Sequence, residues 1–347
     1  MSSLRLVHVG AIALMIPAFA IARSTPPQAV PPEPVLRCLE PVAGVTWLRW
    51  KGNGDATLNA WCESVGRPVL RAPVFTESAD ITQLTILSWN VHVGGGRAEE
   101  LIPELMKETA SKSGGLVVLL QETFRTGWDV PDSYPPTLHP PGAIRPRRPA
   151  PDVTALANEL DLSLAYVPSM RNGSATNVSQ REDRGNAVLS TEALSDVTAI
   201  ELPFGKQRRV AIAATVTPRG SRGKPIRVIV ARLDPDDHRV MQADALAATI
   251  KAFVATNAMP LVVAGDLNAR KGLSDKAVTT LSGQIHRADE CGTGRTSRLP
   301  LRIDTLIGDR LDYMFSTLDD FGLMRTCRTL SDGFGSDHVP LQMTIQF

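Results

Sequence analysis

The sequence predicts an α/β domain that contains many strands. From about residue 82, short apolar runs rich in β-branched residues alternate with segments whose apolar residues recur at helical spacing. Two of the runs, Leu116–Leu120 and Leu261–Ala264, are apolar throughout, which is typical of strands buried on both faces. The runs are too numerous and too irregularly connected for a simple doubly wound sheet, and no internal repeat is evident.

The expected elements follow in chain order. Strands are expected at residues 85–89, 116–120, 162–167, 188–190, 209–216, 226–231, 261–264, 313–316 and 341–345. Helices are expected at residues 101–110, 155–160 and 240–254. Residues 123–151 are rich in proline and are expected to form a long surface loop, which carries the basic cluster Arg145, Arg147 and Arg148.

The composition is that of an ordinary globular protein, with 43% hydrophobic and 21% charged residues. Lysine and arginine number 37 against 36 aspartates and glutamates, so the formal net charge is +1. This balance argues against a protein that binds polyanions through its bulk charge. Any attraction to nucleic acid must come from local basic patches.

The part of the chain before residue 82 divides into three segments. Residues 1–22 have the layout of a signal peptide, because Arg5 precedes an apolar run that ends in small-residue cleavage patterns. The run is short for a membrane span of about 20 residues, although an uncleaved anchor is the alternative. Residues 23–36 are a Pro-rich linker, residues 37–81 a small N-terminal extension, and residues 82–347 the main domain. We therefore expect an exported protein, periplasmic or secreted, with no membrane span after removal of the leader.

The four cysteines agree with export. Cys38, Cys62, Cys291 and Cys327 show no C-x-x-C spacing, which argues against a zinc site. In an oxidising compartment they are expected to form two disulfides. The pairs Cys38–Cys62 and Cys291–Cys327 are favoured because each is nearest in sequence, and free buried thiols are the alternative if the leader is not a signal.

Five polar clusters lie at or just after the ends of predicted strands. They are Ser88-Trp89-Asn90-Val91-His92, Gln121-Glu122, Gly265-Asp266-Leu267-Asn268, Leu311-Asp312-Tyr313 and Ser336-Asp337-His338. A carboxylate that follows an apolar strand is held on a rigid element and faces the edge of the sheet. Open α/β sheets bind their ligands at that edge.

The residue types in these clusters suit one chemistry. Glu122, Asp337 and Asn90 offer oxygen ligands, which favour Mg²⁺ or Mn²⁺ over zinc. Asp266 offers a second carboxylate that would orient or deprotonate a water. His338 and Asp312 offer an imidazole with a carboxylate that orients it and favours the charged ring. Together these groups are the parts needed for metal-assisted hydrolysis of a phosphate ester.

In this order the clusters resemble the motifs of the endonuclease/exonuclease/phosphatase superfamily, over roughly residues 84–347. Arg184-Gly185-Asn186-Ala187-Val188-Leu189-Ser190 also resembles that family's G-N-A-[IV]-L-S strand. One motif alone is a weak signal, but five in order at strand ends are specific. The resemblance implies a four-layered α/β sandwich, in which two packed mixed β-sheets are flanked by helices.

The resemblance also implies roles for the site residues. Asn90 and Glu122 would bind the metal, and Asp337 would complete its outer shell or a second metal position. Asp266 would align and activate the attacking water. In the remaining roles, Asn268 would hydrogen-bond the scissile phosphate or the water, and His338, held by Asp312, would contact a non-bridging phosphate oxygen.

One position departs from the family pattern. Arg232 stands where the family often carries a histidine, in the strand before the G-D-x-N motif. A guanidinium would clamp a phosphate, but with a pKa above about 12 it cannot readily give up a proton. Leaving-group protonation would then fall to His338 or to a metal-bound water. Asn186 is a further candidate for binding the substrate, although a structural role at the strand edge is an equal alternative.

These observations predict an exported, Mg²⁺-dependent phosphodiesterase that acts by in-line attack of an activated water. A nucleic acid is the favoured substrate, and sphingomyelin-type or phosphoinositide-type lipids are the alternative. A non-catalytic module that binds a phosphate ligand is the third hypothesis, and Arg232 is its main support. A Ser-His-Asp hydrolase is disfavoured, because the chain has no G-x-S-x-G motif and Ser336, Asp337 and His338 are contiguous. Oligomeric state is left open.

Overall fold

The computed structural model describes residues 42–49, 56–73, 80–140, 149–173, 181–220, 224–256, 259–270, 274–285, 295–297 and 310–347. Contacts divide the chain into two compact units, residues 1–34 and 35–347, and every described residue belongs to the second unit. The signal peptide and the Pro-rich linker therefore lie outside the described residues and stay predictions. Within the described residues no helix is long and apolar enough to cross a bilayer.

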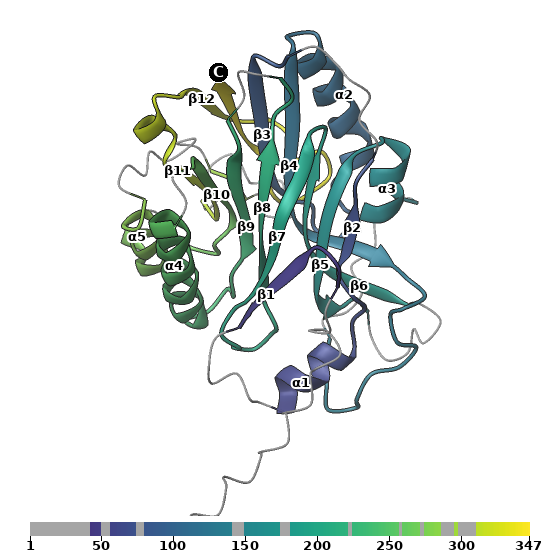
Figure 1. Cartoon of the computed structure of the whole chain (residues 1–347). Helices are drawn as coiled ribbons and strands as arrows, with labels where there is room; N and C mark the ends of the chain where they lie inside the picture. The colour runs from purple at the N-terminus through teal and green to yellow at the C-terminus, as the bar shows by residue number, and fades with distance from the viewer. Residues whose placement is uncertain are drawn as a thin grey trace, which may run out of the picture. The chain divides into compact units, whose positions relative to one another are not determined.

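Two mixed β-sheets form the centre of the second unit (Figure 1). One sheet has six strands in the order β1 (Val45–Arg49), β7 (Ala193–Glu201), β8 (Val210–Thr217), β9 (Ile226–Arg232), β10 (Leu261–Asp266) and β11 (Asp312–Ser316). The other has seven in the order β12 (Met324–Thr329), β13 (Leu341–Gln346), β3 (Gln83–Asn90), β4 (Gly114–Thr126), β6 (Glu182–Ser190), β5 (Ser163–Arg171) and β2 (Val69–Arg71). Each sheet combines parallel pairs, such as β9–β10 and β3–β4, with antiparallel ones.

Helices lie on the outer face of each sheet. Helices α4 (His238–Thr256) and α5 (Lys276–Ser282) cover the six-stranded sheet, and α2 (Ala98–Ala110) and α3 (Val153–Glu159) cover the seven-stranded one. The described residues also contain the short helix α1 (Ala56–Glu63) and the 3₁₀ helix η3 (Leu318–Phe321). The order helix, sheet, sheet, helix confirms the predicted four-layered sandwich.

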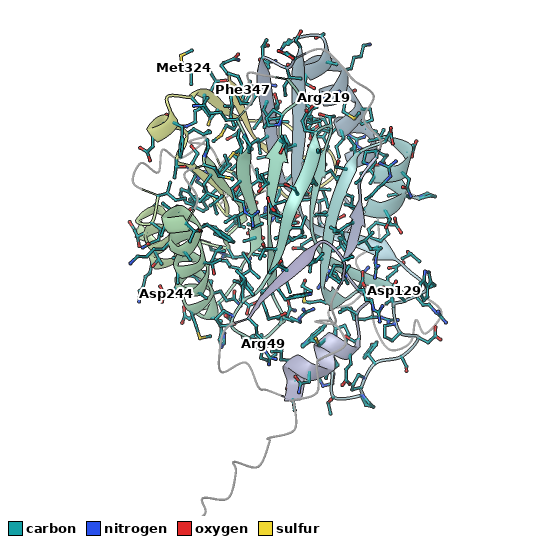
Figure 2. The ribbon with its side chains drawn as sticks, in the orientation of Figure 1. Arg49, Asp129, Arg219, Asp244, Met324 and Phe347 are labelled. Atoms are coloured by element: carbon teal, nitrogen blue, oxygen red, sulfur yellow. The ribbon has the colours of Figure 1, made fainter. Side chains whose placement is uncertain are left out.

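Strand β9 shows why the apolar runs are continuous. Val228 and Val230 pack in the core between the two sheets, whereas Ile229 and Ala231 pack against the helical layer that contains Leu246 of α4. Successive strand residues point to opposite faces, so a strand in an inner layer must be apolar at every position. The side chains drawn in Figure 2 fill the space between these layers.

All the predicted strands and helices are present, although several extend further than expected, such as β6, which begins at Glu182. The sequence does not predict β1, β2, β7 or β12. Strand β12 is largely exposed and has no apolar face to reveal it. Strand β1 is only five residues long, and although Val45 and Trp47 pack against the core, both remain partly exposed. Strand β7 is exposed in its first half, where a bulge between Ser195 and Thr198 interrupts the register. Period-two patterning is lost in such strands, so periodicity cannot detect them.

The segment before residue 82 adds a strand to each sheet. Strand β1 pairs in parallel with β7, and β2 pairs in antiparallel fashion with β5. Among the described residues no cysteine is a free thiol, and Cys62 and Cys327 are both disulfide-bonded. Their expected partners, Cys38 and Cys291, lie outside the described residues, so the pairing stays a prediction.

The Pro-rich stretch begins later than expected. Strand β4 continues to Thr126, and the described residues 127–140 contain turns but neither helix nor strand. The basic cluster Arg145, Arg147 and Arg148 lies outside the described residues.

Candidate active site

Strand pairing and hydrogen bonds bring four of the five polar clusters together. Asp266, the last residue of β10, pairs with Arg232 at the end of β9 and with Asp312 at the start of β11. Asn90, the last residue of β3, comes from the other sheet, and its Nδ2 donates to Asp266 Oδ2 at 3.0 Å and to Glu122 Oε1 at 3.1 Å. One buried amide group therefore joins the polar ends of the two sheets.

Glu122 reaches this point because strand β4 is irregular. The register with β6 shifts between Leu120 and Thr123, and Glu122 has a φ of 52°. His92, Val93 and Asn268 also have positive φ values, at 48°, 53° and 50°. Left-handed backbone at non-glycine residues costs about 1–3 kcal/mol each and concentrates at functional sites. The sequence carries no signal for this strain, because glycine is absent from these positions.

Glu122 is an ionised carboxylate held by cations. Arg232 Nη2 lies 2.6 Å from its Oε1, and Arg184 Nη1 lies 3.8 Å from its Oε2. Burial raises the pKa of Glu122, but the charges of Arg232 and Arg184 outweigh it and lower that pKa to about 2. Burial lowers the pKa of Arg232, but the charges of Glu122 and Asp266 outweigh it and leave that pKa above its ordinary value.

His338 and Asp312 form a buried pair. His338 Nδ1 lies 2.7 Å from Asp312 Oδ2, and both residues are at most 6% exposed. Burial lowers the pKa of His338, but the charge and hydrogen bond of Asp312 raise it to about 10. The ring is therefore an imidazolium at neutral pH, and because Nδ1 is engaged, Nε2–H is the donor left for a substrate.

Backbone contacts hold this pair in place. Ser336 Oγ donates to the Asn90 carbonyl at 2.7 Å and accepts from the His338 backbone N–H at 3.1 Å. Trp89 Nε1 donates to the His338 carbonyl at 3.2 Å. Trp89 and Ser336 thus hold the loop that contains His338 against the end of β3. Their role in these motifs is structural, because they position the residues that carry the chemistry.

Asp266 is 1% exposed, and burial raises its pKa, as does the nearby charge of Asp312. It accepts hydrogen bonds from Asn90 and from the backbone N–H of Asn268 at 3.0 Å. The Asn268 side chain donates to the Leu233 carbonyl at 2.8 Å, which ties β10 to the end of β9. The predicted contact of Asn268 with phosphate or water stays a prediction.

Asp337, a predicted metal ligand, lies outside the hydrogen-bonded group of Asn90, Glu122 and Asp266. Asp337 pairs with His92, with Oδ1 3.1 Å from the ring Nδ1, and its side chain is 44% exposed. Burial raises the pKa of Asp337, but the hydrogen bond from His92 lowers it overall. The three predicted metal ligands are therefore not all in direct contact with one another. Asn90 contacts Glu122, whereas Asp337 contacts His92. His92, which belongs to the first polar cluster but is given no role from the sequence, is the partner of Asp337.

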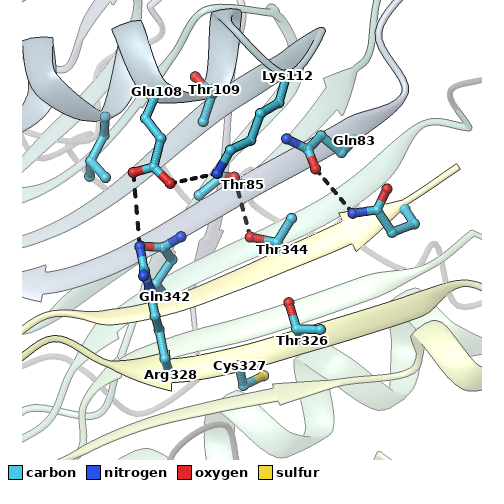
Figure 3. Close-up of a pocket in the computed structure, with 12 residues that line it drawn as sticks. Gln83, Thr85, Glu108, Thr109, Lys112, Thr326, Cys327, Arg328, Gln342 and Thr344 are labelled. Carbon is cyan, nitrogen blue, oxygen red and sulfur yellow. Dashed lines mark hydrogen bonds and ion pairs between the residues drawn. The ribbon is translucent and has the colours of Figure 1, made fainter.

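Asn186 lies on β6 and donates from Nδ2 to the Val210 carbonyl at 2.8 Å. It lines a small cavity with Glu122, Arg184 and Arg232. A second and larger groove lies between α2 and the outer face of β3, β13 and β12 (Figure 3). That groove contains Gln83 at the opposite end of β3 from Asn90, so it is separate from the site.

The donors in the site fit a hard divalent cation. Glu122 is ionised and shares the Asn90 amide with Asp266. Carboxylate oxygens of Asp266 and Asp312 lie within 4.8 Å of each other and of the His338 ring, which as an imidazolium is not itself a ligand. Asp312 Oδ1 is buried and has no hydrogen-bond partner among the described residues, so its lone pairs are available to a water or an ion. The complication is Arg232, whose charge already neutralises Glu122 Oε1.

We expect Arg232→His to bind Mg²⁺ or Mn²⁺ at least about tenfold more tightly at pH 8, because it removes a fixed cation 2.6 Å from the expected ligand. Isothermal titration calorimetry measures the affinity directly. Arg239→His is the matched control, since Arg239 is equally exposed, at 18%, and pairs with Asp275. Unchanged or weaker metal binding in Arg232→His would show that Arg232 does not compete with the ion.

A fold of two packed mixed sheets, with a His–Asp pair and acidic residues at their polar ends, defines a hydrolase-type α/β sandwich. Residues 87–338 match the sequence model of the Endonuclease/Exonuclease/phosphatase family, and the chain belongs to that family. Its members are hydrolases that act on phosphoesters. No curated protein matches the chain significantly.

Solved structures with the same fold are distant in sequence. The human Nocturnin catalytic domain with bound sulfate anion is 17% identical over 78% of this chain and 96% of its own, with a TM-score of 0.51. A family protein from Leptotrichia buccalis is 16% identical over 76% and 100%, also at 0.51. The family protein from Bacteroides vulgatus is 14% identical over 77% and 99%, again at 0.51. These likenesses concern the fold alone.

Proposed function

We propose that the protein is an exported phosphodiesterase that requires a divalent cation, with Mg²⁺ or Mn²⁺ as the ion and a nucleic acid as the substrate. The observation that carries this proposal is the meeting of a buried His338–Asp312 pair with Asp266 and Glu122 at the polar ends of the two sheets. The convergence puts an acid, a base and an ionised ligand within reach of one phosphate group.

In this proposal each residue has a task set by its protonation state. When bound, the cation neutralises charge on the phosphate and lowers the pKa of a coordinated water. Asp266 orients and deprotonates the attacking water. His338 donates from Nε2 to a phosphate oxygen, and Asp312 keeps the ring charged and aligned. Arg232, which ends β9 beside Asp266, contributes a further cation to the phosphate.

The local charge supports a polyanionic substrate in spite of the net charge of +1. Arg184, Arg209 and Arg232 all line the cavity beside Glu122. Burial lowers the pKa of Arg184 and that of Arg209 to about 10, which leaves both charged at neutral pH. The alternatives are a lipid phosphodiesterase and a non-catalytic module that binds phosphate, and the hydrolysis assay distinguishes both from a nuclease.

Export is part of the same proposal. It rests on the signal layout of residues 1–22 and on the disulfide-bonded state of Cys62 and Cys327, which suits an oxidising compartment. Periplasmic or secreted localisation would be tested by cell fractionation. Mass analysis of the non-reduced protein would determine whether Cys38 pairs with Cys62 and Cys291 with Cys327.

We expect purified protein to hydrolyse plasmid DNA or RNA with Mg²⁺ and to lose this activity completely in EDTA. The physical reason is that the phosphate charge then has no divalent counter-ion in a buried site. Gel and release assays would compare DNA, RNA and a phosphocholine lipid, with Asp266→Asn as the inactive control. Turnover of the lipid alone would replace the nuclease assignment. Binding without turnover of any phosphoester would favour the binding module.

A further inference from the structure

A small cavity beside the catalytic residues is lined by cationic side chains. Its polar walls are Glu122, Ser169, Arg184, Asn186, Arg209 and Arg232. Arg184 and Asn186 are two residues apart on β6 of the seven-stranded sheet. Arg209 precedes β8 and Arg232 ends β9 in the six-stranded sheet. The cavity therefore lies between the two sheets and shares Glu122 and Arg232 with the candidate active site.

The charges around this cavity are unequally compensated. Arg209 is engaged, since its Nε donates to Asp234 at 2.8 Å and its Nη2 to Gln207 at 2.9 Å. Among the described residues, the ion pair of Arg184 is with Glu122, at 3.8 Å, and Glu122 is shared with Arg232. Arg232 also lies 3.4 Å from Asp266, so Arg184 is the least compensated of the three guanidinium groups that line the cavity.

Buried donors in the cavity also lack acceptors. The Arg184 side chain is 4% exposed, and its Nε has no hydrogen-bond partner among the described residues. Arg232 Nη1 is likewise unpartnered within the described part of the chain. Buried N–H groups are almost always paired in folded proteins, so a site that leaves two guanidinium donors open is shaped for an acceptor that arrives with a ligand.

We propose that this cavity is an anion subsite that receives an oxygen of a second phosphate group of the substrate, next to the scissile phosphate. Its volume of about 10 Å³ accepts one water-sized atom, so the rest of that phosphate would lie at the mouth of the cavity. The inference rests on the proposed function, and it narrows the substrate to phosphodiesters that carry another phosphate a few bonds away. A polynucleotide backbone or a phosphorylated nucleotide end has that chemistry. A phosphocholine head group presents a cation at the corresponding position, and three arginines disfavour it.

Binding is tested first without catalysis. In EDTA, we expect inorganic phosphate to bind the wild-type protein in calorimetry and to raise its melting temperature more than chloride at equal ionic strength. Phosphocholine at the same concentration is expected to do neither. Arg184→Gln should weaken phosphate binding about tenfold, because it removes the least compensated cation. Arg239→Gln, which lies on α4 and pairs with Asp275, should bind phosphate as the wild type does.

A second variant protects this test against misfolding. Ser169 lines the cavity at 6% exposure, and Ser169→Asp would add a negative charge while keeping all three arginines. Circular dichroism would establish that each variant is folded. Phosphate binding that is retained in both folded variants, or that is absent from the wild type, would overturn the subsite.

The substrate class is tested by a pair of dinucleotides. With Mg²⁺, we expect the wild type to have an approximately tenfold lower KM for the thymidine dinucleotide with a 5′-phosphate than for the same dinucleotide without it. Arg184→Gln should bring this ratio close to one. Phosphate binding without hydrolysis of either dinucleotide would refute the proposed function and leave the subsite standing. Equal hydrolysis of both by the wild type, with no phosphate binding in EDTA, would refute the subsite and leave the function standing.

Discussion

Replacing Asp312 by asparagine is expected to reduce phosphoester hydrolysis by about 10²–10⁴-fold. Asp312 Oδ2 lies 2.7 Å from His338 Nδ1, and it is the largest favourable influence on the charge of the ring. Without this carboxylate the burial of His338 dominates, so its pKa falls from about 10. An asparagine would preserve the shape of the pair and remove its charge, which isolates the electrostatic effect.

The loss should grow with pH. The wild-type imidazolium persists to about pH 10, whereas the ring of the variant loses its proton at a lower pH. The rate of the variant, divided by that of the wild type, should therefore fall as the pH rises from 6 to 9. The raised pKa also stabilises the fold. That contribution is fully present below the unfolded value of about 6.5 and is lost as the pH rises through the folded value of about 10.

Initial rates of wild type and Asp312→Asn, measured from pH 6 to pH 9 at saturating Mg²⁺, would check both parts of this expectation. The exposed Asp320→Asn, in the 3₁₀ helix η3, is the control and should keep wild-type rates. A constant ratio across the pH range would mean that Asp312 does not act through the proton of His338.

Replacing Asp183 by alanine is expected to lower the free energy of unfolding by about 3–5 kcal/mol. Asp183 is 0% exposed and accepts from Arg125 Nη2 at 2.8 Å, from Tyr166 Oη at 2.7 Å and from the Gly66 backbone N–H at 2.8 Å. Among the described residues, its loss leaves the buried Arg125 with Asp129, at 3.3 Å, as its remaining charge partner. It also releases Gly66, which precedes β2.

Urea unfolding would measure this effect against a matched ion pair. Asp161, whose side chain is 73% exposed, pairs with Arg71, and Asp161→Asn, which suits the left-handed backbone of this residue, should cost no more than about 1 kcal/mol. The double variant Asp183→Leu with Arg125→Leu should recover much of the loss, since it leaves no charge buried alone. Equal destabilisation by Asp183→Ala and Asp161→Asn would contradict the proposed role of the buried network.

Local patterns in the sequence were sufficient to predict the inner strands and the polar strand ends, whereas the four layers were predicted from the resemblance to the family. Continuous apolar runs such as Leu116–Leu120 indicate inner strands, because both faces of those strands are covered. A polar cluster directly after such a run must lie at the sheet edge. Asn90, Asp266 and Asp312 were therefore found from their positions in the chain. Exposed strands such as β12 leave no such pattern and were missed.

The sequence by itself determined the buried inner strands, the family motifs and the residue types that gather at the site. Only the tertiary structure decided which of these residues meet. Strand order and the packing of one sheet against the other decide three contacts. These are the pairing of Arg232 with Glu122, the pairing of Asp337 with His92 and the cavity shared by Arg184 and Arg209. Periodicity indicates how much of a strand is buried, but it holds no information about which distant strand lies opposite. The charges in this site are balanced between residues of the two sheets, so the sequence pattern alone could not predict their pairing.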